Sequence, residues 1–133
     1  MSNPKNYNFK FYTGIARAMN NHNKIMPTPR FTTLDVSILC LIKSFYESKT
    51  KFYMSNKELG EIMIADPSTI QRSIDRLIAV GLVTKEIIYV GAKPQRLLTY
   101  QKQAMQNIID LYWIAYWIAI CRMVGSNIEM VGS

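Results

Sequence analysis

The chain has 133 residues, of which 49% are hydrophobic and 19% charged, and its net charge is +7. This length suits one ordinary domain with a proper core, and the composition excludes an intrinsically disordered chain. Residues 1–30 hold five basic residues and no acid, and residues 65–100 hold five basic and three acidic residues. Such blocks suggest a polyanionic partner such as nucleic acid, and ordinary solubility charge explains them equally well.

Two cysteines and one histidine supply neither a disulfide framework nor a zinc cluster. Both cysteines, Cys40 and Cys121, lie in apolar helical patterns and are expected to be buried thiols. There is no phosphate-binding glycine loop, and the acidic residues of the middle region suit helix caps and solvated helix faces. We therefore expect no metal, no cofactor, no small-molecule substrate and no enzymatic activity. The N-terminus lacks the apolar core of a secretory signal, so we expect a cytoplasmic location.

Residues 1–30 are predicted to form a basic arm followed by a short helix. The first ten residues are polar with interleaved aromatics, which is typical of an extended segment. A helix over 11–22 would place Ile15 and Met19 on one face. Two prolines then interrupt the chain, because proline cannot continue a helix.

Residues 31–100 carry three successive helix-start signals. Thr32 can cap a helix over 32–46, with Asp35 three residues on as in a capping box. Ser55 and Glu58 form a second capping box. The third signal is Asp66 followed by proline, which suits the first helical position.

The third of these helices has a clear inner stripe and a clear end. Its stripe consists of Ile70, Ile74, Leu77 and Ile78. Gly81 ends the helix, as glycine commonly does. The turn before it contains Ile64, and a β-branched residue resists positive φ.

Two strand-like segments follow, at 82–90 and 96–100, joined by turn residues at 91–95. Two short helices with a tight turn and then a hairpin predict a mainly α fold with a β-hairpin wing. The sequence from Ser55 through Ile70 to Val83 resembles the winged helix-turn-helix DNA-binding family. It looks most like the winged-helix domains of plasmid and phage replication initiators and related small regulators.

The resemblance implies a double-stranded DNA partner, with the third helix reading bases in the major groove. The residues spaced for an outward face of this helix are Ser68, Gln71, Arg72 and Asp75. Arginine pairs with guanine and glutamine with adenine, and Ser68 and Thr69 at the helix N-terminus suit a phosphate. The same spacing also describes any solvated helix face. The predicted DNA contacts are Ser68, Thr69, Gln71, Arg72, Asp75, Arg76, Lys93, Arg96, Lys5, Lys10 and Arg30.

Lys93 and Arg96 are expected to flank the wing tip and to supply salt-dependent affinity, as is the basic arm. The alternatives are a hairpin with ordinary surface charges and an arm whose aromatics pack on the core.

Residues 101–133 are predicted to form a dimerisation helix, from about 101 to 124, and a tail. Its run over 111–121 is apolar on every side but too short to span a membrane. A second copy would cover it, and burial in a cleft of the same chain or peripheral membrane attachment are the alternatives. The predicted dimer contacts are Tyr112, Trp113, Tyr116, Trp117 and Ile120.

The sequence thus predicts a homodimer that binds an inverted-repeat DNA site and regulates replication, transfer or transcription of a plasmid or phage. The alternative functions are a winged helix used for protein contact and a regulator attached to the membrane surface.

Overall fold

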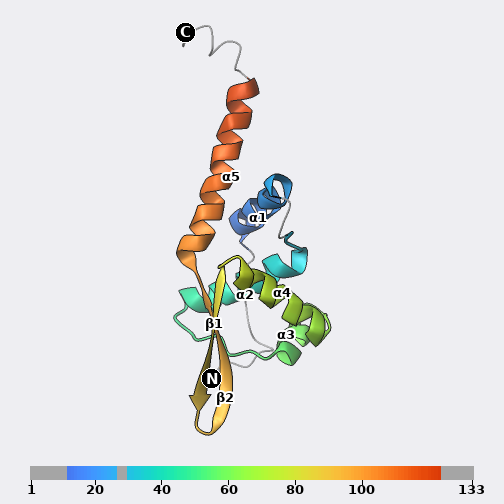
Figure 1. Ribbon diagram of the computed structural model, residues 1–133, viewed down its shortest axis with the longest axis vertical. Helices are drawn as coiled ribbons and strands as arrows, with labels where there is room; N and C mark the ends of the chain where they lie inside the picture. Colours follow the sequence, from blue (N-terminus) through green and yellow to red (C-terminus); the bar gives the residue numbers. More distant parts are fainter. Residues whose placement is uncertain (1–11, 27–29, 124–133) are drawn as a thin grey trace.

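The computed structural model describes residues 12–26 and 30–123. Within them the fold is mainly α with one antiparallel hairpin, as the sequence predicts (Figure 1). The elements are α1 (Thr13–Ile25), α2 (Thr33–Glu47), α3 (Asn56–Met63), α4 (Pro67–Ala79), β1 (Val83–Val90), β2 (Lys93–Tyr100) and α5 (Lys102–Met123).

Helix α2 forms the centre of the core. Every residue from 38 to 42 is buried in this helix, so it is covered on all sides. Helices α1, α3 and α4 and strand β2 all contact it. The predicted stripe of α4 is confirmed for Ile70, Ile74 and Leu77, which are all fully buried. This burial fixes which face of α4 points outward.

The helix ends follow the predicted signals with one exception. Both capping boxes are present, the first between Thr32 and Asp35 and the second between Ser55 and Glu58. Asp66 stands at the N-cap of α4, but its side chain makes no capping hydrogen bond, so that part of the prediction is wrong. Pro67 occupies the start of the helix and has no amide hydrogen that would need a cap.

In the turn between α3 and α4, the backbone at Ala65 comes close to the backbone at Gly60. Ile64 adopts a left-handed conformation with φ of 55°, and its side chain is 93% exposed. A Cβ at Gly60 would lie 2.5 Å from the carbonyl oxygen of Ala65, so this position in α3 accepts only glycine. The glycine that allows this close approach therefore lies inside α3 and not in the turn itself.

The hairpin is longer and its turn shorter than the sequence predicts. The second strand begins at Lys93, and only Gly91 and Ala92 connect the strands. Gly91 has a φ of 67°, which the first position of a tight hairpin turn requires. Near the base, the amide of Leu98 donates to the carbonyl of Phe52 over 3.1 Å, which fastens β2 to the segment before α3.

Helix α5 packs along α1 with its first half and then extends away from the body (Figure 1). Met105 is fully buried, whereas Trp113 and Trp117 are exposed. Cys40 is buried as expected, but Cys121 is exposed near the end of α5, so the expectation of a buried thiol is wrong there. Among the residues described, no helix combines the length and apolar character that crossing a bilayer requires.

Candidate nucleic-acid interface

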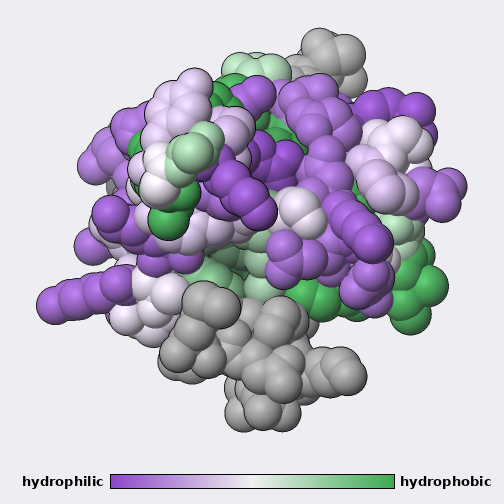
Figure 2. Space-filling view, turned by 90° about the horizontal axis from the view of Figure 1, so that it is seen from below, coloured by the Kyte–Doolittle hydropathy of each residue, from purple (hydrophilic) through white to green (hydrophobic). Residues whose placement is uncertain are grey.

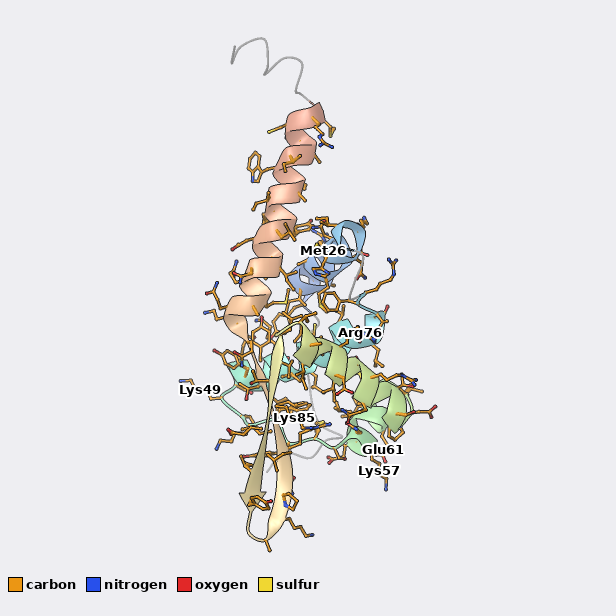
Figure 3. All side chains as sticks on the ribbon, viewed as in Figure 1. Met26, Lys49, Lys57, Glu61, Arg76 and Lys85 are labelled. Atoms are coloured by element: carbon orange, nitrogen blue, oxygen red, sulfur yellow. The ribbon has the colours of Figure 1, made fainter. Side chains whose placement is uncertain are left out.

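The α3–α4 pair and the hairpin lie at the end of the molecule opposite the far end of α5 (Figure 1). Seen from this end, the surface is largely hydrophilic, with apolar side chains in several separate patches (Figure 2). Lys57 and Glu61 project from α3 away from the body, and Lys85 extends from the hairpin (Figure 3). The molecule therefore presents a polar surface flanked by a projecting hairpin.

The outward face of α4 carries polar side chains, as the spacing predicts. Ser68, Arg72 and Asp75 are exposed, and Thr69 and Gln71 are half-buried. The guanidinium of Arg72 donates to the hydroxyl of Thr69 over 3.3 Å, a long and weak hydrogen bond. Arg72 is thus held only loosely and is free to reach a ligand.

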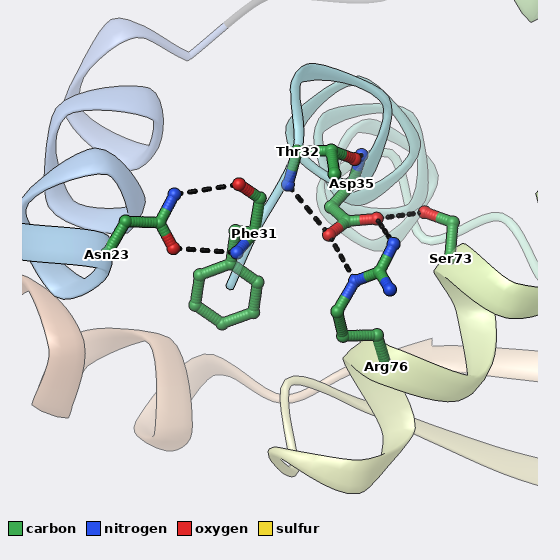
Figure 4. A network of polar contacts seen from close by, with 6 residues as sticks. All are labelled: Asn23, Phe31, Thr32, Asp35, Ser73 and Arg76. Carbon is green, nitrogen blue, oxygen red and sulfur yellow. Dashed lines mark hydrogen bonds and ion pairs between the residues drawn. The ribbon is translucent and has the colours of Figure 1, made fainter. Parts of the chain in front are cut away.

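Arg76 belongs to a network inside the domain rather than to this outward face (Figure 4). Its Nε donates to Oδ2 of Asp35 over 2.7 Å, and its Nη2 donates to Oδ1 over 3.1 Å. The Ser73 hydroxyl also donates to this carboxylate, as does the backbone amide of Thr32, over 2.9 Å. The hydrogen bond from Asp35 raises the pKa of Arg76 above its ordinary value.

The carboxylate of Asp35 is completely buried and joins two helices. A buried charge of this kind is tolerable only when hydrogen-bond donors surround it, and here the side chains of Ser73 and Arg76 and the amide of Thr32 do so. Because Asp35 lies in the first turn of α2 and two of its donors come from α4, the network fixes how α4 sits on α2. Arg76 is therefore a positioning residue.

Arg96 also points into the molecule, from the middle of β2. Its Nη1 donates to Oδ1 of Asn56 over 2.6 Å, and its Nη2 donates to the carbonyl of Met54 over 2.8 Å. Burial lowers the pKa of Arg96, and the charge of Asp75 opposes that shift. The expectation that Arg96 flanks the wing tip is wrong, because the tip begins three residues earlier at Lys93.

Asn56 continues this network to the outward face of α4. Its Nδ2 donates to Oε1 of Gln71 over 2.6 Å, and Nε2 of Gln71 donates to Oδ1 of Asp75 over 2.8 Å. Both polar atoms of the Gln71 amide are therefore occupied within the protein. Recognition of adenine by glutamine uses both atoms, so Gln71 could pair with a base only after giving up these partners.

Asn56 and Asp35 are site residues that sequence reasoning missed. The capping patterns in the sequence do locate both residues in the first turn of a helix, Asp35 in α2 and Asn56 in α3. Their long-range partners, Arg96 and Arg76, are about 40 residues away along the chain. No local signal connects residues so far apart, and only the packed fold brings them together.

The remaining predicted DNA contacts are dispersed. Lys93 is exposed at the wing tip, and Arg30 is exposed just before α2. Lys5 and Lys10 lie outside the described residues.

The predicted dimer contacts share one helix but differ in exposure. Trp113, Tyr116 and Trp117 are between 48% and 62% exposed, and Tyr112 and Ile120 are half-buried. The rings contact mainly each other: Trp113 lies 5.4 Å from Tyr112 and 5.7 Å from Tyr116 between centroids. Within the described residues, three of these five side chains are exposed to solvent.

Similar folds occur among solved structures. A possible transcriptional regulator from Methanosarcina mazei Go1 has a TM-score of 0.51 and 19% identity, covering 86% of this chain and 85% of the other. The transcriptional regulator BldR from Sulfolobus solfataricus gives 0.48 and 20%, covering 90% and 78%. MepR, a transcription regulator of the Staphylococcus aureus multidrug efflux pump MepA, gives 0.47 and 10%, covering 90% and 84%.

No protein-family model and no curated protein matches the sequence. The likeness to the Methanosarcina mazei structure, at this low identity, is one of fold. Together with the order of two short helices, a tight turn and an antiparallel hairpin, it confirms that this chain has the winged helix-turn-helix fold.

Proposed function

We propose that the protein is a regulator that binds double-stranded DNA, reads bases with α4 and acts as a homodimer. The observation that carries this proposal is the division of α4 into two faces. Its inner face is fixed by buried apolar residues and by the Asp35 network, and its outer face offers Ser68, Arg72 and Asp75 to a ligand. A rigid helix with outward donors and acceptors is what reading a major groove requires.

The charge of the chain supports the same partner. The net charge is +7, and the exposed cations Lys57, Arg72 and Lys93 come from α3, α4 and the wing tip. A polyanion that touches all three elements would gain affinity from released counterions. Arg72 pairs best with guanine and Asp75 with the amino group of cytosine, so the preferred half-site should contain both bases.

The exposed aromatic surface of α5 supports the homodimer. Trp113, Tyr116 and Trp117 form a contiguous apolar surface of the kind that marks an interaction site. A second copy supplies an identical surface, and a two-fold dimer presents two copies of α4. Its DNA site would then be an inverted repeat with half-sites about one helical turn apart, or a multiple of it. A role in a plasmid or phage stays a prediction from the sequence resemblance.

Selection of binding sites from a random DNA pool tests the proposal directly. We expect enrichment of one inverted repeat, with affinity for it about a thousandfold or more above that for random DNA. The affinity should fall with salt on both DNAs, because phosphate contacts contribute to each. Arg72→Ala should remove most of the enrichment, whereas Arg17→Ala, an exposed cation on α1, should not. Failure to enrich any sequence would contradict the proposal.

A further inference from the structure

Three hydrogen bonds connect strand β2 to the outward face of α4 through Asn56, the first residue of α3. Nη1 of Arg96 donates to Oδ1 of Asn56 over 2.6 Å, and Nδ2 of Asn56 donates to Oε1 of Gln71 over 2.6 Å. Nε2 of Gln71 in turn donates to Oδ1 of Asp75 over 2.8 Å. Since all three bonds are short, these four side chains act as one unit, which we call the Asn56 network.

The two ends of the Asn56 network fix the direction of every bond in it. The guanidinium of Arg96 can only donate, and the carboxylate of Asp75 can only accept. A side-chain amide has one donating and one accepting end, so turning either amide over would place two donors or two acceptors against each other. Asn56 and Gln71 therefore each have a single orientation that satisfies both neighbours.

The network is anchored at its inner end. Nη2 of Arg96 donates to the carbonyl oxygen of Met54 over 2.8 Å, and Met54 is buried. Asn56 and Gln71 are half-buried, and Asp75 is exposed. Asn56 is thus held by a side chain with little freedom of its own, and it holds Gln71 back from the exposed end.

We infer that Asn56 determines the specificity of α4 by withholding Gln71 from the DNA bases. The inference rests on the proposed function and deepens it, because it assigns which side chains of α4 read bases. Two-point pairing with adenine requires the glutamine amide to donate to N7 and to accept from the N6 amino group. Both atoms of Gln71 are occupied within the network, so base reading is left to the exposed side chains of Arg72 and Asp75.

The withholding is effective because releasing Gln71 costs more than one hydrogen bond. It leaves Nδ2 of half-buried Asn56 without its acceptor and removes a donor from Asp75. Pairing with adenine discriminates against a wrong base by about tenfold or more, and the cost of release offsets that gain. Asn56 is therefore a positioning residue, and Arg96 gives the wing strand an influence on base reading without contact to DNA.

Selection of binding sites with the parent and with Asn56→Ala tests the inference. We expect the parent to show at most about twofold preference for adenine opposite Gln71, and Asn56→Ala to gain a preference of about tenfold or more. Asn56→Ala/Gln71→Ala should lose this gain, which identifies the position and shows that Gln71 carries it. Replacing a residue that only supports the fold would weaken specificity throughout the site and would add none at one position.

Two further variants separate the release of Gln71 from damage to the fold. Arg96→Lys keeps a donor for Asn56 and should keep the weak adenine preference of the parent. Asn56→Ala/Arg96→Met removes both partners of the inner bond, so no buried guanidinium is left unpaired. This double variant should gain the same preference for adenine, and it carries the test if Asn56→Ala alone folds poorly.

The outcomes distinguish the inference from the function on which it rests. A parent that already selects adenine at a position where Gln71→Ala abolishes the preference would overturn the inference, because Gln71 would then read DNA despite Asn56. Folded Asn56→Ala or Asn56→Ala/Arg96→Met protein that binds the parent site without any gain for adenine would also overturn it. A parent that enriches no DNA sequence would instead overturn the proposed function, and the inference with it.

Discussion

Helix α4 and the far half of α5 differ in how far their apolar side chains are buried. In α4 the apolar residues Ile70, Ile74 and Leu77 are fully buried, and the exposed positions are polar. In α5 residues 113–121 are apolar all round, and Trp113 and Trp117 remain exposed. The apolar side chains of α4 are therefore covered by its own chain, whereas the described residues leave the far half of α5 uncovered, which is the basis of the proposed homodimer.

The two helices also differ in how their orientation is fixed. Asp35 and Asn56 hold α4 through hydrogen bonds from α2 and α3 as well as through packing. The described hydrogen bonds of α5 side chains are mostly local pairs such as Gln106 with Asp110. If α4 reads bases as proposed, it needs this fixed orientation because base contacts depend on geometry, whereas the proposed dimer would fix the far half of α5 through contact with a second copy.

The largest expected effect comes from removing the guanidinium that faces Asp35. Arg76→Ala leaves a fully buried carboxylate without its charged partner, and we expect a loss of about 3–5 kcal/mol in the free energy of unfolding. Urea denaturation followed by circular dichroism measures it.

The double variant Asp35→Ala/Arg76→Ala separates the ion pair from simple packing. Without the buried charge, it should be less destabilised than the sum of the two single variants. Strict additivity would show that Arg76 does not stabilise the carboxylate, and would contradict the assigned positioning role.

The second prediction concerns the partner of α5. Trp113→Glu/Trp117→Glu would place charges in the proposed interface, and we expect dimerisation to weaken by about a hundredfold or more. Sedimentation at micromolar concentration measures the mass, and the melting temperature of the parent should rise with its concentration. Asn107→Glu, an exposed position in the first half of α5, is the matched control and should stay dimeric. A parent that is monomeric at these concentrations would refute the dimer.

The third prediction distinguishes the two outward residues of α4. Arg72→Ala should cost about 1–3 kcal/mol in binding to the preferred site and much less on random DNA. Gln71→Ala should cost less than Arg72→Ala, because Gln71 must first give up its bonds to Asn56 and Asp75. Equal losses on both DNAs would mean that these side chains touch only the DNA backbone.

Local signals were sufficient to predict most of the fold. Capping boxes at Thr32 and Ser55, the stripe of α4 and the glycine at 81 each specify one element from a few neighbouring residues. The wing was predicted too short because Pro94 looks like a turn residue, although an edge strand accepts proline where its nitrogen needs no partner.

The site was predicted less completely because its arginines depend on tertiary contacts. Arg72, Arg76 and Arg96 look alike in the sequence, yet only Arg72 points outward. Arg76 binds Asp35 and Arg96 binds Asn56, each on another element of the fold. The spacing of residues along one helix does not predict such partners.

The smallest expected effect is a gain in stability at the turn that introduces α4. Ile64 has a φ of 55° and is 93% exposed, so a β-branched residue bears the cost of a left-handed backbone and gains little packing. Ile64→Asn should raise the free energy of unfolding by about 0.5–1 kcal/mol, because asparagine tolerates this conformation without the added chain entropy of glycine. Ile64→Gly should gain less for that reason.

Ala79→Gly, in the right-handed last turn of α4, is the control and should lose about 0.5–1 kcal/mol. If Ile64→Asn also retains DNA affinity, the isoleucine side chain contributes neither to folding nor to DNA binding. If the free energy of unfolding falls instead, the side chain makes a contact, in the folded chain or in the proposed dimer, that outweighs the backbone strain.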